Sequence, residues 1–131
     1  MWLLDTNAWI AYLNRRPSPI HQKITNMDIQ TLFISEIIKA ELYYGAYKSQ
    51  NIMQNREKIE QLFEVVPSLE FDQEAARIAG EIRANLAKQG TPIGLYDIQI
   101  AALALRHQLI LVTHNTKEFC RIPLLKLEDW Q

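Results

Sequence analysis

"TLFISEIIKAELYYG", residues 31–45, contains both patterns that decide the fold. Its first five residues are almost continuously apolar, which is typical of a short strand buried on both faces of a sheet. The rest has helical periodicity, and on a helical wheel Glu41 lies within the apolar stripe that runs from Ile37 to Tyr44. A carboxylate on that face must shift its pKa, lose its charge or bind a cation.

The same alternation of short apolar runs and longer amphipathic segments continues along the chain. Strands are expected at 2–5, 31–35 and 109–113, with weaker ones at 68–71 and 124–127. Helices are expected from residue 6 or 7, from 36, and at 52–66, 72–90 and 97–108. Strands that are apolar on both faces need helices on both sides, so the pattern predicts an α/β fold with a mainly parallel central sheet.

Length and composition narrow the class of protein. The chain has 131 residues, is 48% hydrophobic and carries a net charge of −1, which predicts one globular domain over residues 1–131. Such a charge disfavours coating of nucleic acid by bulk attraction. The single cysteine, Cys120, excludes an intrachain disulfide and fits a reducing compartment. With no signal-peptide pattern and no long apolar run, we expect a cytoplasmic protein without membrane contact.

Acidic residues follow the predicted strands. Asp5 ends the first strand, and Asp97 opens the helix before the strand 109–113, on the same helical face as the apolar core. In parallel α/β sheets, ligands bind outside the carboxyl ends of the strands. Each aspartate has a simpler interpretation as a helix cap. Together with Glu41, however, they indicate a site for a hard divalent cation, Mg²⁺ or Mn²⁺.

Four motifs and the chain end resemble one known family. They are "LLDTNAWI" (3–10), "SEIIKAELYYGAYKS" (35–49), "GTPIGLYDIQIAALAL" (90–105), "LVTHNTKEF" (111–119) and the closing "RIPLLKLEDWQ" (121–131). In this order and at these separations they resemble the PIN-domain ribonucleases of the VapC type, the toxin half of bacterial VapBC toxin–antitoxin pairs. The resemblance implies a PIN-like three-layer α/β/α fold.

The resemblance also implies roles for individual residues. Asp5, Glu41 and Asp97 match the metal-binding acids, with Mg²⁺ as the expected ion and Mn²⁺ as its alternative. Many PIN domains have an aspartate where this chain has Asn115, so Glu118 is expected to complete the catalytic acids directly or through water. Hydrogen bonds that orient these acids are expected from Thr6, Thr113 and Asn115.

The expected function is that of a metal-dependent endoribonuclease toxin. Family resemblance implies hydrolysis of RNA, with tRNA and the anticodon region of initiator tRNA as the candidate substrate, and products with a 5′-phosphate and a 3′-hydroxyl. It also implies inhibition by a VapB-like antitoxin, contact with DNA only through that antitoxin, and a homodimer. Side chains expected to contact RNA are Lys39, Lys88, His114 and Lys117.

Two other functions fit parts of the sequence. If Asn115 leaves the site unable to hold a metal ion, the protein would be a catalytically silent PIN-like module that binds RNA or acts as a scaffold. In an aspartyl-phosphate protein, Asp5 would act as a nucleophile, but Asn7 stands where such proteins carry a second aspartate.

Overall fold

The sheet has five strands, all parallel, in the order β3-β2-β1-β4-β5. A computed structural model describes residues 1–14 and 16–131. The strands are β1 (Trp2–Leu4), β2 (Leu32–Ser35), β3 (Ser68–Leu69), β4 (Ile110–Val112) and β5 (Leu127–Glu128). The predicted parallel α/β sheet is therefore confirmed.

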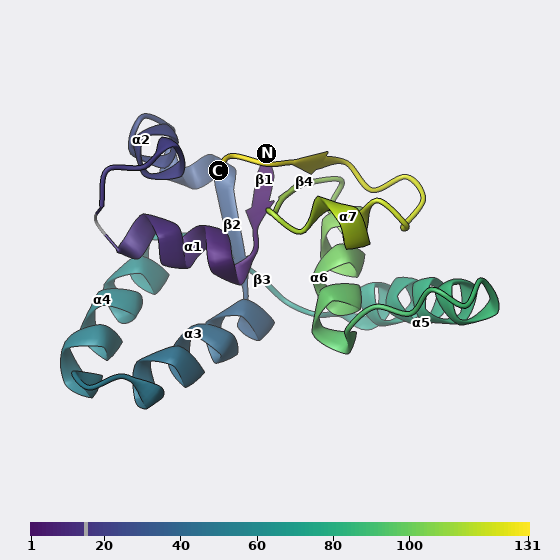
Figure 1. The fold of residues 1–131 in the computed structure, drawn as a ribbon, viewed down its shortest axis with the longest axis horizontal. Helices are drawn as coiled ribbons and strands as arrows, with labels where there is room; N and C mark the ends of the chain where they lie inside the picture. Colours follow the sequence, from purple (N-terminus) through teal and green to yellow (C-terminus); the bar gives the residue numbers. More distant parts are fainter. Residues whose placement is uncertain (15) are drawn as a thin grey trace.

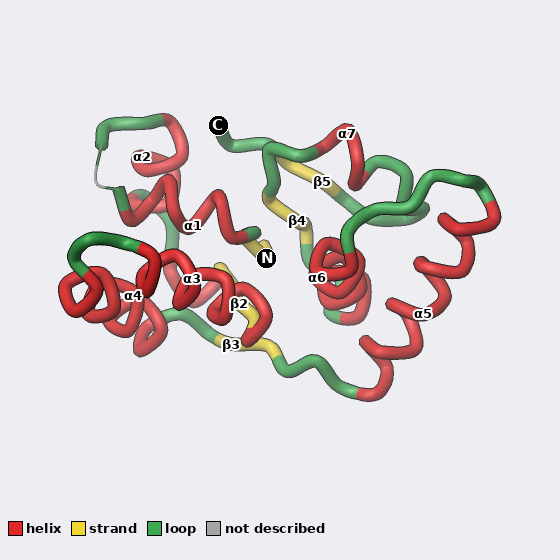
Figure 2. Tube along the Cα trace, turned by 60° about the horizontal axis from the view of Figure 1, so that its bottom comes forward, coloured by secondary structure: helices red, strands yellow, loops and turns green. Residues whose placement is uncertain are grey.

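Helices cover both faces of this sheet (Figure 1). They are α1 (Thr6–Leu13), α2 (Pro19–Thr25), α3 (Glu36–Lys48), α4 (Ile52–Val65), α5 (Gln73–Lys88), α6 (Leu95–Arg106) and α7 (Thr116–Phe119), with a 3₁₀ turn at Ile29–Thr31. In two views α1 to α4 lie on one side of the sheet and α5 and α6 on the other (Figures 1 and 2). This is the expected three-layer α/β/α arrangement.

The central strand β1 sets the position of the site. It pairs with β2 on one side and β4 on the other, so that Leu3 lies beside both Phe33 and Leu111. Because all the strands run in the same direction, their carboxyl ends lie at one edge of the sheet. The residues that follow β1 and β4 are Asp5 and Thr113, and they are neighbours at that edge.

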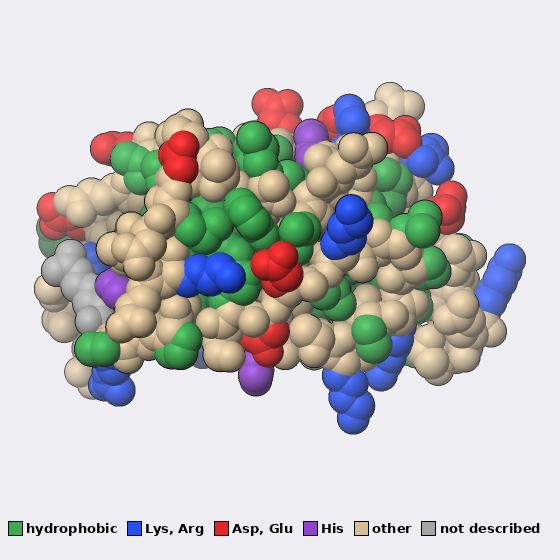
Figure 3. Space-filling view, turned by 90° about the horizontal axis from the view of Figure 1, so that it is seen from above, with side chains coloured by type: hydrophobic (Ala, Val, Ile, Leu, Met, Phe, Trp, Pro, Cys, Tyr) green, Lys and Arg blue, Asp and Glu red, His purple; other side chains and the backbone are tan. Residues whose placement is uncertain are grey.

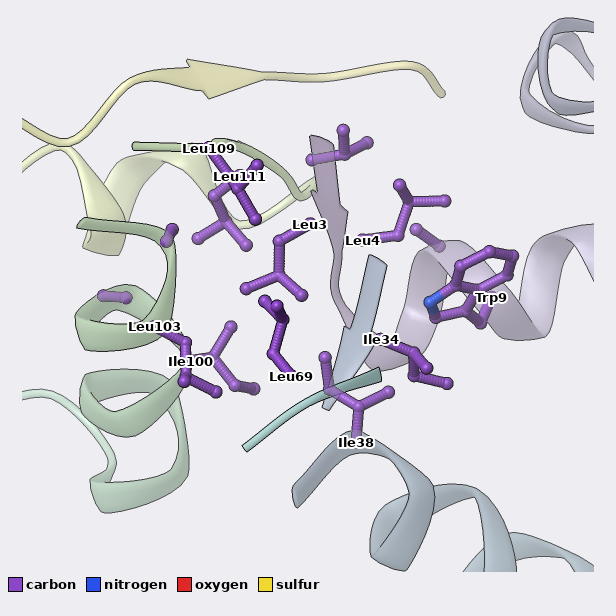
Figure 4. Packing of buried hydrophobic residues seen from close by; sticks show 14 of the residues in the cluster. Leu3, Leu4, Trp9, Ile34, Ile38, Leu69, Ile100, Leu103, Leu109 and Leu111 are labelled. Atoms are coloured by element: carbon purple, nitrogen blue, oxygen red, sulfur yellow. The ribbon is translucent and has the colours of Figure 1, made fainter. Parts of the chain in front are cut away.

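The core fills the space between the sheet and its helices (Figure 4). Leu3 and Leu111 are fully buried on the face that Leu103 of α6 covers, and Ile38 of α3 packs in the same core. Removal of these side chains from water supplies the main driving force for folding. The same packing fixes α3 and α6 against the strands, and these two helices carry Glu41 and Asp97.

Two of the differences from the predicted boundaries affect the description of the site. The sixth helix begins at Leu95 with Gly94 as its N-cap, so Asp97 lies inside the first turn and does not cap it. The last strand is Leu127–Glu128 instead of 124–127, because Leu124 is 92% exposed and has a positive φ of 70°. None of the described helices is long and apolar enough to cross a membrane.

Candidate active site

Asp5 caps a helix and also faces the other acids. Its Oδ1 accepts a hydrogen bond of 2.9 Å from the backbone N–H of Ala8, which satisfies one of the free donors at the start of α1. The expected capping role is therefore real. It occupies one oxygen and leaves the second oxygen for another partner.

Glu41 lies on the third helix within reach of the first. The Thr6 hydroxyl donates a hydrogen bond of 2.8 Å to its Oε2, as expected for a residue that orients this acid. Within the described chain, no lysine, arginine or histidine forms an ion pair with Glu41. A buried protein cation is thus not what balances this carboxylate there.

Asp97 reaches the same place from the opposite layer. The N-cap of α6 is Gly94, and no side chain caps this helix. The Asp97 carboxylate therefore accepts no capping hydrogen bond at the start of α6. The interpretation of Asp97 as a helix cap is wrong, and its carboxylate is free to act in the site.

A short chain of hydrogen bonds follows β4. Thr113 is 1% exposed, and its hydroxyl accepts the backbone N–H of Asn115 at 3.0 Å. The Asn115 side-chain amide in turn donates to Oε2 of Glu118 at 3.0 Å. Asn115 therefore holds the fourth acid in place by a hydrogen bond, where an aspartate would repel it.

The pKa of two acids shows that the carboxylates share one environment. Burial raises the pKa of Asp5, and Glu41 and Asp129 raise it further, against hydrogen bonds from Thr113 and Ala8 that lower it. Burial also raises the pKa of Asp97, with further increases from Glu118, Glu41 and Asp5 in that order. Repulsion thus links all four predicted acids, although they are distant in sequence.

The donor set suits a hard divalent cation. Its members are carboxylate oxygens with hydroxyl and amide neighbours, which are the ligands that Mg²⁺ and Mn²⁺ prefer. Across residues 1–14 and 16–131, no three acidic, histidine or cysteine side chains form a group tight enough to hold one ion as they stand. Carboxylates repel one another, which favours a wider spacing than metal coordination requires. The predicted ligation by Asp5, Glu41 and Asp97 stays a prediction.

The side chains expected to contact RNA occupy different environments. The Lys39 ammonium pairs with Glu36 at 3.1 Å and is only 16% exposed, so it is already engaged. Lys88 and Lys117 are exposed in the last turn of α5 and in α7. His114 is exposed and bonds to Asp129 through Nδ1 at 3.0 Å. On the face shown in Figure 3, basic and acidic side chains are scattered.

Asp129 is a site neighbour that the sequence reasoning missed. It directly follows β5, at the same sheet edge as Asp5, whose pKa it raises. Hydrogen bonds from Gln131 and His114 lower the pKa of Asp129 itself. The sequence signal for Asp129 is an acid that follows an apolar run. The predicted strand at 124–127 begins three residues before β5, so Asp129 does not directly follow it in the sequence prediction.

Comparison with known proteins identifies the family. Residues 2–125 match the PIN domain model. The chain is 40% identical over 129 residues to a protein of Salmonella typhimurium named tRNA(fMet)-specific endonuclease VapC, covering 98% of this chain and 97% of that protein. Its fold also matches the structure of DNA-bound VapBC from Salmonella typhimurium, with a TM-score of 0.89 and 39% identity. The match covers 99% of this chain and 98% of that chain. The structure of VapBC2 from Rickettsia felis, bound to a DNA fragment from its promoter, matches with a TM-score of 0.88 and 34% identity. This match covers 99% of this chain and 98% of that chain. The strand-end acids and these matches together place the chain in the PIN-domain family, among the VapC ribonucleases.

Proposed function

We propose that this protein is an endoribonuclease toxin that hydrolyses phosphodiester bonds in tRNA and is inhibited by a VapB-like antitoxin. The observation that carries the proposal is the cluster of Asp5, Glu41, Asp97 and Glu118 at the carboxyl edge of the sheet. The name of the Salmonella relative, a tRNA(fMet)-specific endonuclease, supports tRNA as the substrate. We propose the cytoplasm as its place of action, because tRNA is found there.

We further propose that the activity depends on Mg²⁺, with Mn²⁺ as a substitute. Asp5, Glu41 and Asp97 would hold the cation, which when bound neutralises the phosphate charge and makes water a stronger nucleophile. The protein's own groups position these acids: Thr6 donates to Glu41, and Asn115 donates to Glu118. Because Asp5 and Asp97 are half-buried, bulk water screens their negative charges less, which favours binding of a cation between them.

The regulatory partner follows from the solved relatives. The structural matches include VapBC complexes bound to DNA. We propose that this chain likewise binds an antitoxin and meets DNA only through it. We also propose that the protein forms a homodimer, as its resemblance to the family implies.

The test is cleavage of initiator tRNA by purified protein. Wild-type protein should cleave with Mg²⁺ or Mn²⁺ and stop with EDTA, and the products should carry a 5′-phosphate. The Asp97→Asn variant should lose on the order of a hundredfold or more in rate, as expected when a metal-binding group is lost. Asp28→Asn, at an exposed cap that accepts from Gln30, is the matched control and should cleave normally. Full cleavage in EDTA would refute the metal dependence.

A further inference from the structure

A hollow of about 740 Å³ opens beside the acids. It is lined by Thr6, Glu36, Ile37, Ala40, Glu41, Tyr44 and Tyr96. The lining comes from three helices, α1, α3 and the first turn of α6. Glu41 belongs both to this hollow and to the acid cluster, so the hollow is continuous with the candidate active site.

Two tyrosines at this hollow are unusually exposed. Tyr44 is 60% exposed and Tyr96 is 64% exposed, although both rings border an apolar surface. Leu95, next to Tyr96, is 54% exposed as well. Exposed apolar groups that gather at a hollow commonly mark a binding surface.

The chemistry of the hollow favours a flat, neutral group. Ile37 and Ala40 provide apolar contact, and the two rings provide faces for stacking. The carboxylates of Glu36 and Glu41 would repel a phosphate placed inside. The Lys48 ammonium lies 5.0 Å from the centre of the Tyr44 ring, which places a positive charge beside the hollow for the backbone of a nucleic acid.

We infer that Tyr44 and Tyr96 form a stacking subsite for an unpaired base of the RNA substrate, next to the bond that is cleaved. The placement next to that bond rests on the proposed function. A base in the hollow would put its sugar–phosphate backbone outside, between the acid cluster and Lys48. Such a subsite selects single-stranded RNA, because a paired base must first be unpaired and unstacked.

Tyr47 provides a matched comparison on the same helix. It is 54% exposed, but its ring stacks on Tyr43 at 6.5 Å and lies under the Arg56 guanidinium at 5.6 Å. It does not line the hollow. Loss of this ring should therefore leave RNA binding unchanged.

The experiment uses a short single-stranded RNA that carries one 2-aminopurine, mixed with the full-length protein in EDTA. Wild-type protein should quench the 2-aminopurine fluorescence, since quenching reports stacking. Tyr44→Leu and Tyr96→Leu should each bind about tenfold more weakly and with less quenching, whereas the Phe variants should bind like wild type. Tyr47→Leu should match wild type. In Mg²⁺, the Leu variants should raise KM more than they lower kcat.

Three results would overturn the inference. The first is that wild-type protein does not quench the 2-aminopurine fluorescence. The second is that the Leu variants bind the RNA with wild-type affinity. The third is that light scattering shows the Leu variants as monomers where wild type is a dimer. The last result would assign the surface to a second copy of the chain. Wild-type protein that stacks the probe but cleaves no RNA would instead refute the proposed function and leave the stacking subsite intact.

Discussion

Single hydrogen bonds decide how the acids of the site behave. Glu41 interrupts an apolar helix face, and its described partner is the Thr6 hydroxyl instead of a cationic side chain. Asp5 divides its two oxygens between a helix cap and the site. At this scale, Glu41 and Asp5 are each oriented by a neutral hydrogen-bond donor and not by a cationic side chain.

Replacement of Thr6 by valine tests this orientation. Thr6→Val keeps the shape of the side chain but removes the donor to Glu41, so Mg²⁺ affinity should fall by roughly 10- to 100-fold. The measurement is the Mg²⁺ concentration that gives half-maximal cleavage. Thr6→Ser keeps the hydroxyl and should behave like wild type. Equal Mg²⁺ requirements in the two variants would show that Thr6 does not orient Glu41.

The raised pKa of Asp97 predicts a pH dependence of stability. The folded protein holds this proton more tightly than the unfolded chain, so ionising Asp97 disfavours folding as pH rises above its ordinary pKa of 3.8 and through the raised value. Without metal, Asp97→Asn should therefore become more stable than wild type as pH increases over this window. Urea unfolding in EDTA at a series of pH values measures the difference.

Asp72 is the matched control with the opposite sign. Its pKa is lowered by the Ala75 N–H and by Arg106, so its contribution is present above pH 3.8 and is lost as pH falls through the lowered value. Asp72→Asn should then lose stability relative to wild type as pH rises. The same trend in both variants would contradict the assigned environments.

At the scale of elements, α3 and α6 carry the site, and a side-chain cap fixes the start of α3 alone. The Ser35 hydroxyl is buried and accepts the N–H of Ile38 at 3.2 Å, which caps α3 at the end of β2. Gly94 begins α6 without a side-chain cap. The strand-to-helix junction after β2 thus places Glu41 two turns from the sheet edge.

Ser35→Ala should destabilise the protein by about 1 kcal/mol, because the α3 cap is lost. It should also slow cleavage, since α3 carries Glu41. In α2, the Ser18 hydroxyl accepts the equivalent hydrogen bond from the N–H of His21 at 3.1 Å. Ser18→Ala should therefore cost a similar amount of stability. However, α2 carries no predicted catalytic residue, so cleavage should not change. Urea titrations and initial rates give both quantities, and equal losses of rate would disprove the link.

At the scale of the whole molecule, the parallel sheet gathers acids that are more than one hundred positions apart in the chain. Their mutual repulsion makes the site a source of instability that a bound cation would relieve. Stability and metal binding should therefore be linked.

Mg²⁺ should raise the melting temperature of the wild-type protein, with a gain of ~2.7 kcal/mol when free Mg²⁺ is about 100-fold above Kd. Glu41→Gln should show little of this shift, and its melting temperature in EDTA should be no lower than that of wild type. Glu57→Gln, on the exposed surface of α4, should keep the full shift. Strong destabilisation of Glu41→Gln in EDTA would mean that Glu41 has a structural role.

The sequence by itself determined the α/β class and the parallel sheet, and it predicted the acids of the site. Continuous apolar strands, helical periodicity and the motif order are local patterns, and a carboxylate within an apolar helical stripe is visible without coordinates. Helix ends were also readable where a residue type marks them, as at Gly90, which has a φ of 68° after α5.

Only the tertiary structure decided which groups meet. The interpretation of Asp97 as a cap failed because Gly94 starts the helix, and Asp129 was missed because a two-residue strand is held by pairing with β4 more than by its own sequence. The hollow between Tyr44 and Tyr96 likewise joins two helices from opposite layers. Contacts of this kind depend on packing between segments distant in sequence, which a local pattern does not encode.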